Sequence, residues 1–350
     1  MKRLFAILAV TVCLVGMSQL ALAAAQKGSG EVVVYNWSDY IPEDVLKDFT
    51  KETGIKVVYS TYESNEAMIA KVKLLKGKTY DVVCPSTYFL QQMIADGLLA
   101  ELDHSKLPNL AQMDPRLMDQ SFDPQNKHSV PYMWGTYGLI VNRKYAKDMK
   151  VDSWKALLLP EFAGKIMLSD DPRDTIGMAL LSQGYSPNST KEAEIKKAFD
   201  FLHKVRPNVR VFDVTASKRA MVNEEAYIGC IWNGDAELAI EENPDLEFVY
   251  PKEGVVMWAD NFAITSGAAN LENAHIFVNY MMRPDVALRC IEEYGYSTPN
   301  LEAIKMMDPE MRDNVVLNPT DKELKSSKML DSVGKAQRIY NQYWEKLMNN

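Results

Sequence analysis

The chain of 350 residues is 47% hydrophobic and 25% charged, and its formal net charge is −8 at pH 7. These values are typical of a folded protein. No block of Lys and Arg stands out, which argues against nucleic acid or an anionic membrane surface as a partner. The acidic balance is compatible with a cationic ligand, although solubility alone explains it.

The first 25 residues have the pattern of an export signal. Lys2 and Arg3 precede an apolar run over about 4–15, which is shorter than the roughly 20 residues that a membrane-spanning helix needs. Small residues follow, and we expect cleavage after Ala23 or Ala25. The sequence therefore predicts a signal peptide at 1–25 and an exported mature protein that is not inserted in the membrane.

The mature chain is more acidic and has an odd number of cysteines. Loss of two of the 39 basic residues with the leader leaves 37 against 47 acidic residues, a net charge of −10. Cys84, Cys230 and Cys290 remain, far apart in the sequence and flanked by apolar residues. We interpret them as buried thiols, so the fold does not depend on a disulfide framework.

Strands and helices alternate in the first third of the mature chain. Strands are predicted at 31–35, 55–59 and 81–84, and helices at about 42–53, 65–76 and 87–95. This order indicates a parallel α/β sheet covered on both faces. In such sheets ligands bind at the carboxyl ends of the strands, so Trp37 and Ser86 should lie on one rim.

The alternation resumes in the middle of the chain. Strands are predicted at 165–169, 227–232, 246–250 and 257–265, and helices near 174–181, 191–205, from Asp235, 271–282, 284–293 and 331–347. No flexible linker separates the two α/β units, so we expect short strand crossings near 136–141 and 260–264 and a hinged cleft. The predicted lobes are 26–137 plus 259–302, and 138–258 plus 303–350.

The sequence contains no recognisable catalytic motif. The segment 77–79 (GKT) lacks the first glycine of a phosphate-binding loop and follows a helix instead of a strand. The four histidines are dispersed, and 170–174 lacks the glycine of a calcium loop. A hydrolase that uses Asp171 and Asp174 would lack a nucleophile. We therefore predict no catalytic residue, no metal site and no cofactor.

Polar and aromatic residues gather just beyond the predicted strands. They are Trp37, Ser38, Asp39, Tyr40, Ser86, Tyr88, Asp171, Asp174, Trp232, Asp235, Trp258, Asp260 and Tyr296. Five are carboxylates, six are aromatic and none is basic, whereas an anion site would recruit Arg, Lys or bare helix N-termini. Trp and Asp occur together at three separate strand ends, and this repetition favours a cation site.

An alkyl polyamine fits this set of residues. Each ammonium has three donors and needs carboxylates or hydroxyls, and the methylene segments need flat apolar walls. Aromatic faces add about 0.5–2 kcal/mol each. Structural roles remain open for single residues: Asp235 as a helix N-cap, Asp174 as a partner of its helix start, Asp171 as a turn residue and each Trp as part of the core.

Eight blocks of sequence carry a resemblance to a known family. They are 35–40 (YNWSDY), 49–54 (FTKETG), 60–66 (STYESNE), 85–88 (PSTY), 131–135 (PYMWG), 231–234 (IWNG), 283–287 (RPDVA) and 295–300 (GYSTPN). Over nearly all of the mature chain, the sequence resembles the periplasmic spermidine/putrescine-binding proteins of polyamine ABC transporters. The resemblance implies a type II periplasmic-binding-protein fold with a ligand cleft between two lobes.

The resemblance also implies a function and a role for each matched residue. A monomeric periplasmic protein would capture a polyamine and deliver it to an inner-membrane ABC permease. Trp37, Tyr40, Trp232, Trp258 and Tyr296 would box the chain of the ligand. Ser86 and Tyr88 would bind one end, and Asp171, Asp174 and Asp260 would bind ammonium groups.

Three positions leave the preferred polyamine open. Asp174 stands where spermidine-preferring members have Glu, and Leu330 falls where they have Gln. Asp235 resembles the putrescine-preferring members. Two other functions also remain: a polyamine sensor that signals to a membrane receptor, and a ferric-iron binder, which the tryptophans at the strand ends disfavour.

Overall fold

The computed structural model describes residues 28–213 and 215–349. The predicted signal peptide and its cleavage site therefore lie outside the described residues. In the part of the chain that is described, no helix is both long and apolar enough to cross a membrane.

The described strands form one twisted sheet in the order β2-β1-β3-β9-β4-β7-β5-β6, with β10 beside β9 and β8 beside β4. Their bounds are β1 Glu31–Trp37, β2 Lys56–Tyr62, β3 Val82–Val83, β4 Ser129–Asn142, β5 Ile166–Leu168, β6 Val209–Phe212, β7 Ile228–Trp232, β8 Leu246–Val249, β9 Val256–Ile264 and β10 Lys328–Met329. The strands β2-β1-β3 are parallel to one another, as are β7-β5-β6. We call these two groups the first and second half of the sheet.

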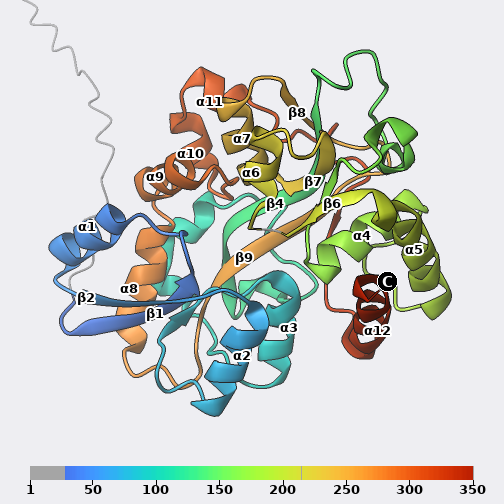
Figure 1. Ribbon diagram of the computed structural model, residues 1–350. Helices are drawn as coiled ribbons and strands as arrows, with labels where there is room; N and C mark the ends of the chain where they lie inside the picture. Colours follow the sequence, from blue (N-terminus) through green and yellow to red (C-terminus); the bar gives the residue numbers. More distant parts are fainter. Residues whose placement is uncertain (1–27, 214, 350) are drawn as a thin grey trace, which may run out of the picture.

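Helices cover both faces of each half (Figure 1). Their bounds are α1 Glu43–Thr53, α2 Asn65–Leu74, α3 Thr87–Ala95, α4 Pro172–Ser182, α5 Glu192–Val205, α6 Ser217–Val222, α7 Asn233–Glu242, α8 Leu271–Met281, α9 Pro284–Tyr294, α10 Leu301–Met306, α11 Pro309–Asp313 and α12 Gln337–Met348. The α/β architecture predicted from the alternation of strands and helices is therefore confirmed.

Residue alternation along the strands explains this double covering. Val32 and Val34 of β1 pack with residues of α1, α8 and α9, whereas Tyr35 packs with residues of α2 and α3. In the second half, Leu139 of β4 packs with α4 and α5, and its neighbour Ile140 packs with α6 and α7. Successive side chains of a strand point to opposite faces, so each buried strand joins two layers of helices.

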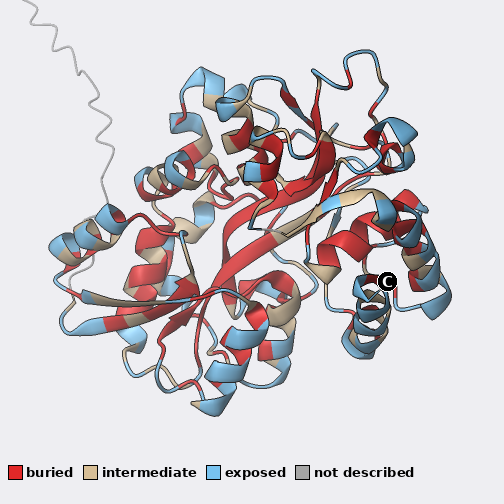
Figure 2. Ribbon diagram, in the orientation of Figure 1, coloured by how far each residue is buried: buried red, intermediate tan, exposed pale blue. Residues whose placement is uncertain are grey.

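The two halves are joined by the long strands β4 and β9. Both predicted crossings, 136–141 and 260–264, lie within these strands. Every residue of β4 is buried, and Figure 2 shows the two strands as a buried diagonal through the molecule. The strand β9 is antiparallel to both β3 and β4, and β4 is antiparallel to β7. The parallel pairing predicted for the sheet therefore holds within each half and not between them.

Several predicted element bounds are wrong. The strand predicted at 55–59 extends to Tyr62, and β6 was not predicted. The last helix begins at Gln337 and not at 331, because 328–329 pairs with β9 and Gly334 adopts a φ of 52° just before the helix. Cys84, Cys230 and Cys290 are free and buried, as predicted.

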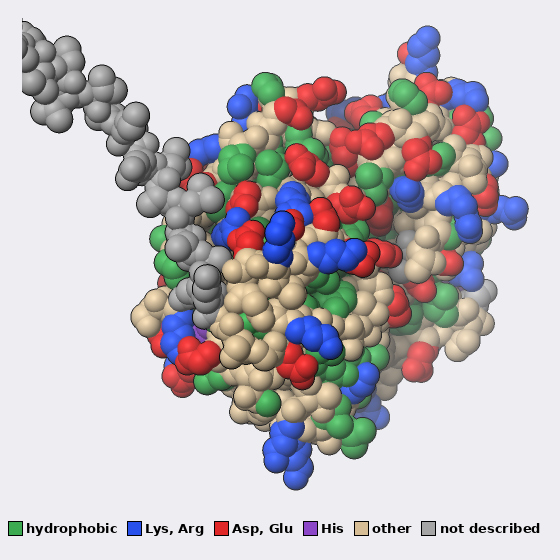
Figure 3. All heavy atoms as spheres, turned by 90° about the vertical axis from the view of Figure 1, so that its left-hand side faces the viewer, with side chains coloured by type: hydrophobic (Ala, Val, Ile, Leu, Met, Phe, Trp, Pro, Cys, Tyr) green, Lys and Arg blue, Asp and Glu red, His purple; other side chains and the backbone are tan. Residues whose placement is uncertain are grey.

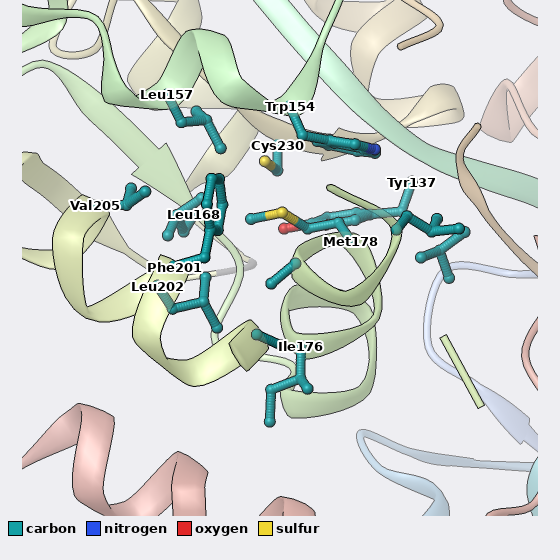
Figure 4. Packing of buried hydrophobic residues seen from close by; sticks show 14 of the residues in the cluster. Tyr137, Trp154, Leu157, Leu168, Ile176, Met178, Phe201, Leu202, Val205 and Cys230 are labelled. Carbon is teal, nitrogen blue, oxygen red and sulfur yellow. The ribbon is translucent and has the colours of Figure 1, made fainter. Parts of the chain in front are cut away.

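The core of the second half is built around Trp154. Figure 4 shows its indole among Tyr137, Leu157, Met178 and Cys230. Its side chain is fully buried, and its Nε1 donates a hydrogen bond to the backbone oxygen of Gly254 at 2.8 Å.

Replacement of Trp154 by Ala should lower the free energy of unfolding by about 3–5 kcal/mol, because it leaves a large cavity in a closely packed core. Urea unfolding followed by circular dichroism measures the change. Leu158→Ala is the matched control, since Leu158 lies in the same short helix but is 39% exposed. Equal losses in the two variants would contradict this view of the core.

Candidate functional site

A cavity of about 660 Å³ lies where the two halves of the sheet meet β9. Its lining contains all thirteen side chains that the sequence pointed to: Trp37, Ser38, Asp39, Tyr40, Ser86, Tyr88, Asp171, Asp174, Trp232, Asp235, Trp258, Asp260 and Tyr296. The carboxyl ends of β1, β3, β5 and β7, with the loops and first helical turns that follow them, supply ten of them, β9 supplies two, and Tyr296 follows α9. Strand ends from both halves of the sheet thus converge on one cavity, and the role of these residues in binding stays a prediction.

Asp260 is a buried carboxylate of the crossing strand β9. Its Oδ1 accepts a hydrogen bond from the Ser86 hydroxyl at 2.6 Å, and its Oδ2 accepts one from the Tyr40 hydroxyl at 2.7 Å. Burial raises the pKa of Asp260 to about 6, although both hydroxyls counteract the rise. Neutral donors therefore orient this carboxylate.

A second layer of hydrogen bonds holds Ser86 in place. The Asn65 side-chain amide Nδ2 donates to the Ser86 hydroxyl at 3.0 Å, and the backbone N–H of Ser86 donates to the side-chain Oδ1 of Asn65 at 3.1 Å. On the other side, the Tyr132 hydroxyl donates to the backbone oxygen of Tyr40 at 2.6 Å. These contacts fix both donors of Asp260 before any ligand arrives.

Aromatic rings form a row along the cavity. The ring centroids of Trp232 and Trp258 lie 6.4 Å apart, those of Trp258 and Tyr296 lie 5.2 Å apart, and those of Tyr296 and Tyr40 lie 6.1 Å apart. All three pairs meet edge to face, the arrangement that ring quadrupoles favour. The row gives the cavity a wall of aromatic side chains.

Two glycines make room for this row. A Cβ atom at Gly135 would lie 2.7 Å from the Trp258 ring and 2.3 Å from Asn233 Oδ1. A Cβ atom at Gly234 would lie 2.5 Å from the Tyr296 ring. Both distances are shorter than van der Waals contact allows, so only glycine lets the rings pack against the backbone at these two positions.

Asp171 and Asp174 occupy the start of α4. The Asp171 Oδ1 accepts hydrogen bonds from the backbone N–H groups of Arg173 and Asp174, so Asp171 is the N-cap of the helix and the alternative of a simple turn residue was wrong. The Asp174 Oδ2 accepts a bond from Trp232 Nε1 at 2.6 Å. Burial, and then the neighbouring Asp171 carboxylate, raise the pKa of Asp174 well above its ordinary value.

Asp235 lies in the first turn of α7 and does not cap it. The helix begins at Asn233, and the N-cap position belongs to Trp232, so the alternative of Asp235 as an N-cap was wrong. Burial raises the pKa of Asp235 to about 6, and the positive charge of Lys218 counteracts the rise. The Asp235 carboxylate therefore does not cap the helix, and it lines the cavity.

The end of β1 and the loop after it are held by two side-chain hydrogen bonds. The Trp37 Nε1 donates to the backbone oxygen of Cys84 at 3.1 Å, and the Ser38 hydroxyl donates to Glu63 Oε1 at 2.6 Å. Asp39 adopts a φ of 48°, a conformation that Asp tolerates better than most residues. This turn follows the end of β1 and places the next residue, Tyr40, in the lining of the cavity.

Sequence reasoning missed eleven lining residues. They are Glu63, Ser64, Asn65, Glu66, Asp170, Pro172, Thr215, Ser217, Lys218, Leu238 and Tyr294. Four of them follow the true end of β2 at Tyr62, and a longer strand prediction would have placed them on the rim. Lys218 corrects the expectation of a lining without basic residues, and no strand-end signal marks it because it lies in α6.

Another basic side chain lies behind the cavity. Arg173 is buried, its Nη2 donates to Asn188 Oδ1 and to the backbone oxygen of Asp331, and its guanidinium lies 5.4 Å from the Tyr88 ring centroid. Among the described residues, no group of three or more His, Cys, Asp or Glu side chains could hold a metal ion.

Comparison with known proteins identifies the family. Residues 44–318 match the model of the bacterial extracellular solute-binding protein family. The chain belongs to this family. Two relatives come from Escherichia coli (strain K12): the spermidine/putrescine-binding periplasmic protein is 41% identical over 95% of this chain and 96% of its own length, and the putrescine-binding periplasmic protein PotF is 34% identical over 95% of each.

A solved structure of a related solute-binding protein supports the fold. The spermidine/putrescine ABC transporter substrate-binding protein PotD of Streptococcus pneumoniae superposes with a TM-score of 0.81 and 36% identity, over 91% of this chain and 99% of its own. This solute-binding protein therefore has the predicted type II periplasmic-binding-protein fold.

Gly135→Ala should disturb the aromatic row of this solute-binding protein. The new methyl group would displace Trp258 and the Asn233 side chain, whose Oδ1 accepts a hydrogen bond from the Thr136 backbone N–H at 2.9 Å. We expect a loss of about 1–3 kcal/mol in unfolding free energy and a changed near-ultraviolet circular dichroism signal from tryptophan. Unchanged stability together with an unchanged tryptophan signal would refute the packing described here.

Proposed function

We propose that this protein captures a linear polyamine, spermidine or putrescine, in the cavity and delivers it to an ABC transporter permease, without catalysing a reaction. The observation that carries the proposal is a set of carboxylates beside a row of aromatic rings, of which Asp260 and Asp174 are buried and Asp235 is half-buried. Asp260, Asp174 and Asp235 all have pKa values raised by burial, which means that each lacks a full compensating charge in the ligand-free protein.

A protonated amine supplies the positive charge that these carboxylates lack. An ammonium supplies three donors and a positive charge, and it would replace the water that a buried carboxylate loses. The methylene segments would lie on the rings of Trp232, Trp258 and Tyr296, which also present negative faces to the charge. A neutral sugar or an anion would leave these carboxylates uncompensated.

The domain arrangement suits capture by closure. The proposed lobes, 26–137 plus 259–302 and 138–258 plus 303–350, each contain one half of the sheet, and β4 and β9 cross between them. Rotation about these two strands would open and close the cavity. We propose a monomer that acts in the periplasm after removal of the signal peptide, as the relatives named above are periplasmic proteins.

Two alternatives are less well supported. Sensing on behalf of a membrane receptor has no support among the relatives reported above. A preference for spermidine lacks one contact that the resemblance implies, because Leu330 stands where spermidine-preferring members have Gln. The Leu330 side chain is apolar and packs in the core of the second half, and its backbone oxygen accepts a hydrogen bond from Thr87.

Asp260→Asn should weaken polyamine binding by about 2–5 kcal/mol, since the ammonium would stay desolvated next to a neutral amide. Isothermal titration calorimetry with putrescine and spermidine measures the change. The matched control is Asp119→Asn, because Asp119 is exposed and its Oδ1 accepts a hydrogen bond from the Gln125 backbone, which an amide oxygen can also accept. Similar affinities for the two variants would count against the proposal.

Polyamine affinity should fall as the pH decreases through about 6. Burial raises the pKa of Asp260 and Asp235 to about 6, and a bound ammonium stabilises the ionised carboxylates, so binding lowers these pKa values and releases protons. Affinity is then high above the pKa of the free carboxylates and is lost below it. Aliphatic amines stay protonated throughout, as Lys does with a pKa of about 10.4.

Calorimetry at several pH values measures this dependence. We expect the dissociation constant for putrescine to rise at least about tenfold between pH 7.5 and pH 5. Near pH 6 the heat should also vary with the ionisation enthalpy of the buffer, because about half of these carboxyls then carry a proton that binding releases. A constant affinity over this range would show that the carboxylates do not bind the ligand.

A further inference from the structure

Arg173 is a buried cation whose hydrogen-bond partners are neutral. Its side chain is 3% exposed, and its Nη2 donates to Asn188 Oδ1 at 2.9 Å and to the backbone oxygen of Asp331 at 3.0 Å. Its Nε and Nη1 have no hydrogen-bond partner, and it forms no ion pair, among the described residues. Burial of a charge without a counter-ion is costly, so a neutral side chain of similar size would cost less free energy at this position.

The place of Arg173 in the fold adds to this cost. Arg173 is the second residue of α4, and a positive charge in the first turn is unfavourable because the N-terminus of a helix is itself positive. Its guanidinium lies 5.4 Å from the ring centroid of Tyr88 and 5.1 Å from that of Tyr340 in α12. Tyr88 lines the cavity, whereas Arg173 does not. The charge is therefore held directly behind the cavity wall.

Two carboxyl groups of the cavity flank Arg173 in the chain. Burial raises the pKa of Asp171, and the backbone N–H groups of Asp174 and Arg173, followed by the Arg173 charge, counteract the rise. Burial and then the Asp171 charge raise the pKa of Asp174, whereas the Trp232 N–H and then the Arg173 charge counteract it. The guanidinium thus favours the ionised form of both carboxyl groups.

Other titratable groups face this pair from the elements packed against it. They are Glu66 of α2, Tyr88 of α3, Tyr137 of β4, Asp260 of β9 and Asp170 of the loop before α4. None of them is basic, and the carboxylates among them oppose ionisation of the pair. Lys218, the basic residue of the lining, forms an ion pair with Glu242 at 3.0 Å.

We infer that Arg173 is a positioning residue of the ammonium site at the start of α4: from behind the cavity, its charge keeps Asp171 and Asp174 ionised for a ligand cation. The inference rests on the proposed function. Arg173 also repels a bound cation, but the ligand would lie on the far side of the two carboxyl groups, where this repulsion acts over a longer distance. The attraction therefore dominates while the carboxyl groups can take up protons, and the repulsion alone remains once they are ionised in any case.

Arg173→Gln tests this inference by calorimetry with putrescine between pH 5.5 and pH 8.5. At pH 5.5 we expect binding about three- to tenfold weaker than in wild type, because loss of the charge raises the pKa of both carboxyl groups. At pH 8.5 we expect binding that is equal or up to about threefold tighter, because a repelling charge has been removed. The ratio of the variant to the wild-type dissociation constant should therefore fall as the pH rises.

Three further variants separate charge from packing. Arg173→Met also removes the charge, and its unbranched apolar side chain fills the site if Gln there prevents folding. Arg173→Lys keeps the charge and should restore the wild-type pH dependence. Arg210→Gln is the matched control, since Arg210 is exposed on β6 and does not line the cavity. Circular dichroism at each pH verifies that the variants are folded.

A ratio of dissociation constants that is the same at every pH would assign Arg173 a structural role alone and overturn the inference. Identical binding by the charge-removing variants and wild type would overturn it as well, and both results leave the proposed function intact. If wild-type protein binds neither putrescine nor spermidine, the proposed function itself fails, and the inference fails with it.

Discussion

The structure depends on carboxylates that are buried at the crossing of two halves of one sheet without a basic side chain to balance each of them. Asp260 shows the constraint most clearly, because its two oxygens are occupied by the neutral hydroxyls of Ser86 and Tyr40. Removal of a charged group from water is costly, and hydroxyl donors compensate only part of the cost. A positively charged ligand would offset the rest of this cost. The unfavourable free energy of burying the carboxylates in the ligand-free protein therefore favours ligand binding.

The strands β4 and β9 make this arrangement possible. The strand β9 carries Asp260 and Trp258 through the middle of the molecule. The strands β4 and β9 are antiparallel to each other, β9 is antiparallel to β3, and β4 is antiparallel to β7. The carboxyl ends of the parallel strands in each half therefore face the same cavity. On the surface seen in Figure 3, by contrast, acidic and basic side chains are interspersed and solvated, and such pairs contribute little.

Much of the site could be predicted from the sequence, because the residues that follow parallel strands must lie on one rim. Trp37, Ser86 and Trp232 were found by that argument. The rest required tertiary information. Glu66 was missed because β2 continues to Tyr62, and Lys218 was missed because it reaches the cavity from a helix face. The caps also could not be assigned: Asp171 both caps α4 and lines the cavity, whereas the hydrogen-bonding capacity of Asp235 is not used by a cap.

The most direct test of the account compares the binding of 1,4-diaminobutane with that of 1,4-butanediol by calorimetry at pH 7.5. The two molecules share a four-carbon chain and differ in charge at their ends. We expect saturable binding of the diamine with a dissociation constant in the micromolar range or below, about −8 kcal/mol or stronger, and no measurable binding of the diol. Comparable binding of both would show that apolar contact, and not the buried carboxylates, determines what this cavity holds.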